Sequence, residues 1–183
     1  MPLFFKRKKY EDRNKLMVES HVVENLTTKY FARRLECKSQ MAGCCLYKGI
    51  VYRADSGFAQ NGMEYFFNQG FRQRDVAIEW DTFTGRKARG HTGSVGISTT
   101  YNYTFAEEWR AEDIYIIDLS NHPMALDVNY SAKRKLDDMY QVDAYQCEIN
   151  VANSIHPEMI FGHYNSVTKV LTKNPAYEGM IVL

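Results

Sequence analysis

The sequence predicts an α+β fold in one domain of ordinary size. The chain has 183 residues, which is enough to bury a substantial core. Its 13 Tyr and 10 Phe residues favour strands and packed pockets over a helical bundle. A helical pattern near the N-terminus is followed by many short β-branched and aromatic segments. Helices placed early and strands placed late are typical of the α+β class.

Residues 8–40 are expected to be helical. Their apolar and aromatic residues fall near one helical face, with charged residues between them: Leu16, Val23, Leu26 and Tyr30. Gly43 and the pair Cys44-Cys45 interrupt this pattern. We therefore divide the chain into an N-terminal helical extension, residues 1–45, and a main domain, residues 46–183.

The main domain is expected to alternate strands with short helices. We predict strands near residues 49–53, 95–98, 113–119, 143–151 and 180–183. We predict helices over 63–69, closed by Gly70, and over 101–110, where Phe105 and Trp109 are four residues apart and so share a helical face. Residues 81–96 contain four glycines and are predicted to form a long loop.

Charge and composition exclude several classes of protein. The net charge of +1 neither indicates nor forbids a nucleic-acid partner, and the basic N-terminal residues are interpreted as a solvated terminus. No run of about 18 apolar residues occurs, so no membrane span is expected. No apolar segment follows the first charges, so we expect no cleavable signal peptide in this chain. The four cysteines lack metal-site spacing, and we expect reduced thiols and no metal.

Polar side chains alternate with apolar ones over residues 145–151. In a strand, Gln146, Glu148 and Asn150 share one face. The other face is apolar and includes Tyr145 and Cys147. The Cys147 thiol is therefore expected to be buried rather than nucleophilic. A polar face of this kind can also be an ordinary solvated surface.

Three motifs in a fixed order make the pattern specific. They are Tyr-Arg-Ala-Asp-Ser at 52–56, Ser-Thr-Thr at 98–100, and Gln-x-Glu at 146–148. In this order they resemble the mono-ADP-ribosyltransferases of the arginine–serine–glutamate class, and in particular the catalytic subunits of pertussis and cholera toxins. Similar flanking segments lie at 67–71, 84–86, 124–129 and 155–160, so the resemblance covers roughly residues 47–165.

The resemblance implies a split β-sandwich around an NAD cleft, with NAD as substrate. It implies that Glu148 is the central catalytic residue, which stabilises the positive charge that develops on the ribose as nicotinamide leaves. Ser98 is expected to orient Glu148. Arg53 is expected to bind the pyrophosphate through paired, charged donors. The cofactor cleft is expected to include Tyr52, Arg53, Asp55, Ser98, Thr99 and Thr100, with Thr99 and Thr100 shaping the nicotinamide pocket.

Gln146 corresponds to the family position that faces the acceptor. A carboxylate there can hold an arginine acceptor by a bidentate ion pair, which a neutral amide cannot do. The resemblance therefore implies a macromolecular acceptor that is not arginine, with a protein side chain favoured over RNA or DNA. A catalytically inactive module that uses the fold for binding is a further alternative, against which the intact Arg53, Ser98 and Glu148 argue.

The sequence departs from the toxins at several points. Thr82 stands where they have a histidine, and His91 is a candidate replacement. The toxins are exported, whereas this chain is expected in the cytoplasm or injected into a target cell. An enzyme active in its own cytoplasm needs control, so we expect an inhibitor, antitoxin or chaperone as a partner and no membrane association. The helical pattern of residues 8–40 leaves two alternatives open: this segment can pack on the main domain, or it can bind that partner.

Overall fold

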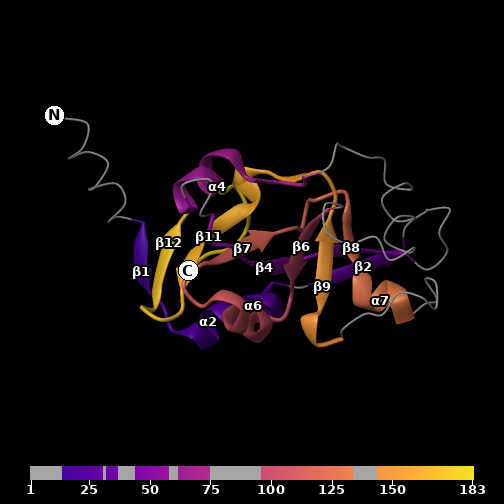
Figure 1. Cartoon of the computed structure of the whole chain (residues 1–183), viewed down its shortest axis with the longest axis horizontal. Helices are drawn as coiled ribbons and strands as arrows, with labels where there is room; N and C mark the ends of the chain where they lie inside the picture. The colour runs from indigo at the N-terminus through magenta and orange to yellow at the C-terminus, as the bar shows by residue number, and fades with distance from the viewer. Residues whose placement is uncertain (1–13, 31, 37–43, 58–61, 75–95, 134–143) are drawn as a thin grey trace.

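The computed structural model describes residues 14–30, 32–36, 44–57, 62–74, 96–133 and 144–183. Within these ranges, ten strands form one antiparallel sheet in the order β1-β12-β11-β7-β4-β6-β9-β8-β3-β2 (Figure 1). A second sheet has two strands, β5 (Phe71–Arg72) and β10 (Ser154–Ile155). Short helices flank the sheet, so the predicted α+β class is confirmed.

The first half of the large sheet contains its most deeply buried strands. Its members are β1 (Lys15–Met17), β12 (Val170–Lys173), β11 (Ile160–Asn165), β7 (Ile114–Asp118) and β4 (Ile50–Ala54). Every residue of β7 is buried, which explains its nearly continuous apolar sequence. The predicted strand at 113–119 is thus confirmed.

The second half consists of β6 (Ile97–Thr100), β9 (Glu148–Val151), β8 (Ala125–Asp127), β3 (Cys45–Lys48) and β2 (Arg33–Glu36). The two halves meet between β4 and β6, where a single residue pair, Tyr52 and Thr100, is in register. By contrast, β4 pairs with β7 over five positions and β6 with β9 over four. This narrow junction divides the sheet into the two parts expected of a split sandwich.

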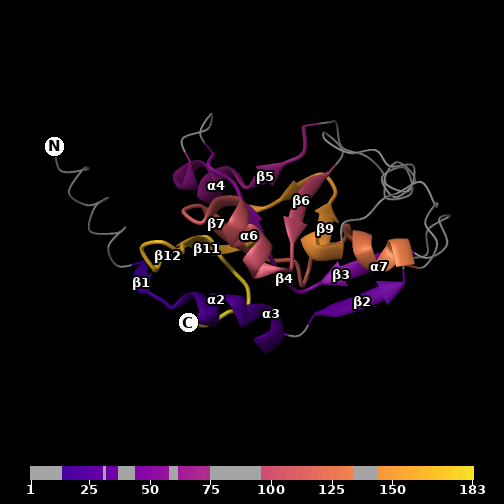
Figure 2. The same ribbon diagram turned by 60° about the horizontal axis from the view of Figure 1, so that its bottom comes forward.

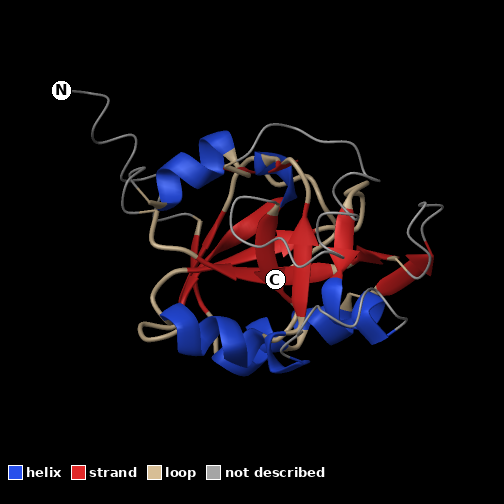
Figure 3. Ribbon diagram, turned by 45° about the vertical axis from the view of Figure 1, so that its right-hand side comes forward, coloured by secondary structure: helices blue, strands red, loops and turns tan. Residues whose placement is uncertain are grey.

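Helices cover both faces of the first half (Figure 3). The described helices are α2 (Ser20–Glu24), α3 (Leu26–Lys29), α4 (Met63–Gln69), α6 (Tyr103–Arg110) and α7 (Val128–Lys133), with 3-10 turns η2 (Ala144–Gln146) and η3 (Pro157–Met159). The predicted helix at 63–69 is confirmed, and Gly70 ends it with φ +70°, a left-handed conformation that suits glycine. Asn102 caps α6 by accepting a hydrogen bond from the Phe105 backbone.

Alternation along β4 separates two core clusters. Val51 lies in one cluster with Phe66 of α4 and with Phe71. Ile50 and Tyr52 lie in the other, together with residues of α2, α3 and α6. Because neighbouring side chains of a strand point to opposite faces, β4 is packed between two helical layers.

The single helix predicted over residues 8–40 is wrong in the described part of that range. Leu16 lies on strand β1, opposite Leu171 of β12, and Arg33–Glu36 pair with β3. Val23 and Leu26 are buried and do lie on helices, but on two separate helices of five and four residues. The strands β1 and β2 close the two edges of the large sheet, and this pairing outweighs local helix propensity. The division at residue 45 stays a prediction.

The strand predicted at 180–183 is also wrong. These residues pair with no strand, and Ile181 alone among them is buried, in the same cluster as Ile50 and Tyr52. In the parts of the chain that the structure describes, no helix has the length and apolar character needed to cross a membrane.

Candidate active site

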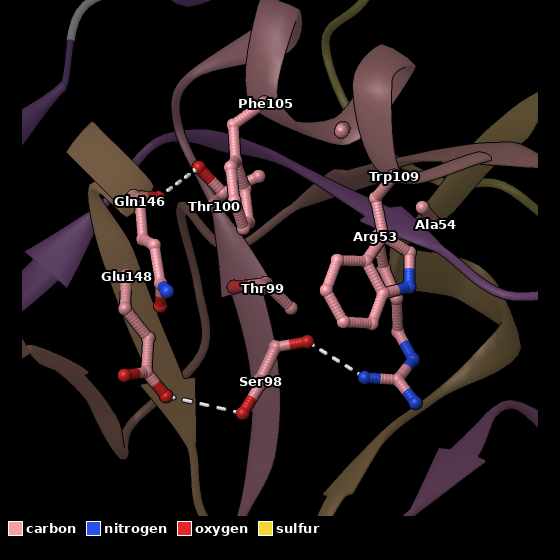
Figure 4. Close-up of a pocket in the computed structure, with 10 residues that line it drawn as sticks. Arg53, Ala54, Ser98, Thr99, Thr100, Phe105, Trp109, Gln146 and Glu148 are labelled. Atoms are coloured by element: carbon pink, nitrogen blue, oxygen red, sulfur yellow. Dashed lines mark hydrogen bonds between the residues drawn. The ribbon is translucent and has the colours of Figure 1, made fainter. Parts of the chain in front are cut away.

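Three neighbouring strands bring the predicted site residues together at the junction of the sheet (Figure 2). Arg53 lies on β4, Ser98 on β6 and Glu148 on β9. All three line a cavity of about 430 Å³ (Figure 4). The described residues that line it are Arg53, Ala54, Ser98, Thr99, Thr100, Phe105, Ala106, Trp109, Gln146 and Glu148.

The carboxylate of Glu148 is held by two donors. Ser98 Oγ donates to Glu148 Oε1 at 3.0 Å, so the predicted contact between these side chains is present. Asn150 Nδ2 donates to the same oxygen at 2.9 Å. Both bonds to Oε1 involve groups on β6 and β9 themselves, which fixes the carboxylate relative to the sheet.

The side chain of Arg53 is held in place by contacts within the protein itself. Its Nη1 donates to the Ser98 carbonyl at 2.7 Å, and its Nη2 and Nε donate to Asp55 Oδ2 at 2.7 and 3.1 Å. The guanidinium also lies 5.3 Å from the centre of the Phe71 ring. Asp55 is itself held, because its Oδ1 accepts a hydrogen bond from the Gly57 backbone at 3.0 Å. A guanidinium fixed on three sides loses little freedom when it binds an anion.

A second cavity, of about 630 Å³, meets the first at Arg53 and Ser98. Arg72 and Arg74 line it together with Asp55. The two cavities thus share Arg53 and Ser98 in their linings, and together they form the candidate cleft. Its dimensions and its basic side chains suit an extended ligand that carries phosphates.

The strand predicted to begin at residue 143 is wrong in its first half. Residues 144–146 form η2, and strand β9 begins at Glu148. Cys147 lies between them with φ +46°, which breaks the strand alternation. Cys147 is therefore only partly buried, and its thiol donates to the Ala144 carbonyl. Tyr145, placed on the apolar face by the sequence, is 49% exposed.

Gln146 reaches the cleft although it lies on a turn. Its backbone carbonyl accepts a hydrogen bond from Thr100 Oγ1 at 2.6 Å, which fixes the turn against β6. Its side chain lines the first cavity next to that of Glu148 (Figure 4). Thr99 and Thr100 line the same cavity, and Thr99 Oγ1 donates to the Ile149 carbonyl at 2.7 Å.

The prediction that the Tyr52 side chain lines the cleft is wrong. It is fully buried on the opposite face of β4, and its hydroxyl donates to the Val23 carbonyl at 2.7 Å. Burial raises the pKa of this hydroxyl strongly. The physical reason is strand alternation: the Tyr52 side chain points to the opposite face of β4 from that of Arg53, where it packs against α2, α3 and α6.

Several residues of the site have no role in the sequence-based prediction. Phe105 and Trp109 line the first cavity with ring centres 6.2 Å apart, and Trp109 is 73% exposed. Their spacing of four residues predicted a shared helical face, but not that this face borders a cavity. Asn150 was placed on the Glu148 face, and it proves to be completely buried.

Other predictions lie outside the described residues. These are the Thr82 and His91 alternatives and the loop at 84–86. Among the residues that the structure describes, no group of three or more His, Cys, Asp or Glu side chains could hold a metal ion.

No protein-family model matches the sequence, and no curated protein does. Solved structures do match. A variant of scabin toxin from Streptomyces scabies is 26% identical, with 87% of each chain covered and a TM-score of 0.52. Scabin in complex with NADH is 24% identical, covering 90% of this chain and 87% of that one, with a TM-score of 0.52. A guanine-specific ADP-ribosyltransferase is 22% identical, covering 87% and 89%, with a TM-score of 0.52.

The fold and the converging Arg53, Ser98 and Glu148 define the ADP-ribosyltransferase class of proteins. The order of the motifs predicted a resemblance to the mono-ADP-ribosyltransferases, and the similar solved structures support it. The nearer likeness to the pertussis and cholera toxin subunits stays a prediction.

Proposed function

We propose that this protein binds NAD in the cleft, cleaves its nicotinamide–ribose bond and transfers ADP-ribose to a macromolecular acceptor. The observation that supports this most strongly is the hydrogen bond from Ser98 to Glu148, formed at the edge of a cavity that Arg53 also lines. The similar scabin structure that contains NADH supports NAD as the ligand.

The two cavities suggest how NAD lies. Nicotinamide carries a positive charge in NAD, and a cation is attracted to aromatic faces. The cavity with Trp109 and Phe105 therefore suits the nicotinamide ring, with Glu148 beside the attached ribose. Arg53, where the cavities join, suits the pyrophosphate. The larger cavity, with Arg72 and Arg74, then takes the adenosine end.

Bond cleavage builds positive charge on the ribose. The bond between the ribose carbon and the pyridinium nitrogen breaks, and its electron pair leaves with nicotinamide, which becomes neutral. Glu148 stabilises the cationic sugar by its negative charge, an effect worth several kcal/mol in a preorganised site. Its Oε1 is held by Ser98 and Asn150. Its Oε2, which no described residue holds by a hydrogen bond, can accept one from a ribose hydroxyl. A lone pair of the acceptor then forms the new bond, and the acceptor loses a proton.

The acceptor is electrically neutral in this proposal, because Gln146 contributes a neutral amide to the lining of the first cavity. An amide can donate and accept at once, so it can pair with the edge of a nucleobase, as asparagine and glutamine do in nucleic-acid recognition. The guanine-specific enzyme among the similar structures supports this acceptor class. A neutral protein side chain fits the same amide and is the second candidate.

Labelling with a tagged NAD separates these acceptors. The protein is incubated with a cell lysate and tagged NAD, and the products are treated with nuclease or with protease. Label that nuclease removes supports a nucleobase, whereas label that only protease removes supports a protein side chain. Glu148→Gln, which should not label, is the matched control. If wild-type protein releases no nicotinamide with either acceptor class present, the transferase proposal fails and a binding module is the better explanation.

Cellular location and control are further proposals. We infer action in the cytoplasm or in a target cell after injection, with an inhibitor, antitoxin or chaperone as a partner. Co-purification of a partner with the intact protein, and its loss when residues 14–36 are altered, tests this idea.

A further inference from the structure

Asn150 is the most deeply buried polar side chain of the site. It lies within β9, in register with Ser98 of β6 on one side and with Leu126 of β8 on the other. Its exposed fraction is 0%. Because strand side chains alternate, Asn150 shares a face with Glu148, two residues earlier. It therefore lies directly behind the carboxylate, away from solvent.

The amide nitrogen of Asn150 connects both of the residues in front of it. Nδ2 donates to Glu148 Oε1 at 2.9 Å and to Ser98 Oγ at 3.3 Å. The single hydroxyl hydrogen of Ser98 goes to Glu148 Oε1, so Ser98 Oγ is free to accept. The amide nitrogen of Asn150 thus has two acceptors, the Glu148 carboxylate and the Ser98 hydroxyl. This arrangement supports the carboxylate once directly and once through the serine.

The other end of the same amide has no comparable function. Asn150 Oδ1 is buried and has no hydrogen-bond partner among the described residues. A buried polar atom without a partner destabilises a protein, and an apolar side chain of the same shape would avoid this cost. Packing alone therefore does not explain an asparagine here, whereas its two hydrogen bonds toward Ser98 and Glu148 do.

We propose that Asn150 is a positioning residue that holds the Glu148 carboxylate in the orientation required for cleavage of NAD. This inference rests on the function proposed above for Glu148. Asn150 does not line the cavity, so it acts through Glu148 and Ser98 and not on the substrate. Its loss should slow the chemical step and leave NAD binding intact, because Arg53 and the cavity walls are unchanged.

The test compares Asn150→Leu, which removes both donors and the unpaired oxygen at similar volume, with wild type. We expect the rate of nicotinamide release at saturating NAD to fall about 10- to 100-fold, because a small misplacement of a catalytic group can slow a reaction by this much. The dissociation constant for NAD should stay within about twofold and the melting temperature should not fall, since the unpaired oxygen is gone. A fall in NAD affinity that accounts for the lost rate would overturn the proposal.

Two further variants keep the result decisive. Asn150→Asp has nearly the same size but no amide donor when ionised, so it should also slow release; a wild-type rate in either folded Asn150 variant overturns the proposal. Asn174→Leu is the structural control, because this buried asparagine bonds to the Pro157 carbonyl away from the cleft. It should lower the melting temperature and leave the rate of the folded enzyme unchanged.

A double variant adds an independent measurement. Ser98→Ala and Asn150→Leu remove donors to the same Glu148 oxygen, so their effects on rate should not multiply when combined. Glu148→Gln distinguishes failure of this inference from failure of the proposed function. If Glu148→Gln is inactive and Asn150→Leu is normal, only the positioning role fails. If Glu148→Gln is as active as wild type, the function proposed for Glu148 fails.

Discussion

Replacing Arg34 with methionine should lower the free energy of unfolding by about 3 kcal/mol. Arg34 on β2 donates from Nε to Asp127 Oδ2 at 2.6 Å, and the Asp127 side chain is completely buried. Removing one partner of a buried ion pair costs about 3–5 kcal/mol, because the remaining charge stays buried and unpaired. The Arg34 side chain is 32% exposed, which places the loss at the lower end of that range. Its guanidinium also lies 5.3–5.7 Å from the ring centres of Tyr101, Tyr130 and Tyr47.

The assay is thermal and chemical unfolding of the variant beside a matched control. A loss of about 3 kcal/mol lowers the melting temperature by roughly 6–12 °C in a domain of this size. Arg33→Met alters the neighbouring, exposed arginine of the same strand and should change stability by less than about 0.5 kcal/mol. Adding Asp127→Asn to Arg34→Met should restore part of the loss, because no unpaired charge then remains. Equal shifts for the Arg33 and Arg34 variants would refute the reasoning.

Three further predictions concern the site, the N-terminal segment and pH. Arg53→Lys should weaken NAD binding about tenfold or more in calorimetry, since lysine cannot contact Asp55 and the Ser98 carbonyl together; unchanged affinity contradicts the role of Arg53. Leu26→Ala should lower the free energy of unfolding, measured in urea, by about 2–5 kcal/mol, because Leu26 is buried in the core. An unchanged urea midpoint would show that the segment around Leu26 does not pack against the core. Burial lowers the pKa of His122 below its ordinary 6.5, so the unfolded state takes up a proton more readily and stability should fall as pH drops through about 6.5. His122→Gln should make the free energy of unfolding depend less on pH in this range. An equally steep pH dependence in the variant would contradict this prediction.

The sequence predicted the central strands and the site residues for related reasons. Strand β7 is buried along its whole length and apolar except for Asp118 at its end, and helix α4 ends at a glycine, so both have strong local signals. Arg53, Ser98 and Glu148 were found because each lies in a short motif and the motifs follow one another in a fixed order. The side chains on neighbouring strands then meet because β4, β6 and β9 are adjacent in the sheet.

The errors arise where the conformation depends on partners far away in sequence. Residues 15–17 and 33–36 are strands because β12 and β3 each offer an edge, and neither edge is visible in the local pattern. The left-handed backbone at Cys147 delays the start of β9, although cysteine gives no sign of it. The role of Asn150 could not be predicted, because a polar residue on a strand face is usually solvated.

The most direct test of the account is the rate of nicotinamide release by Glu148→Gln at saturating NAD. Glutamine keeps the size of the side chain and an oxygen that can accept the bonds from Ser98 and Asn150, so the change is mainly the loss of negative charge. The account predicts a fall of about two orders of magnitude or more with NAD affinity nearly unchanged. Release at close to the wild-type rate would contradict it.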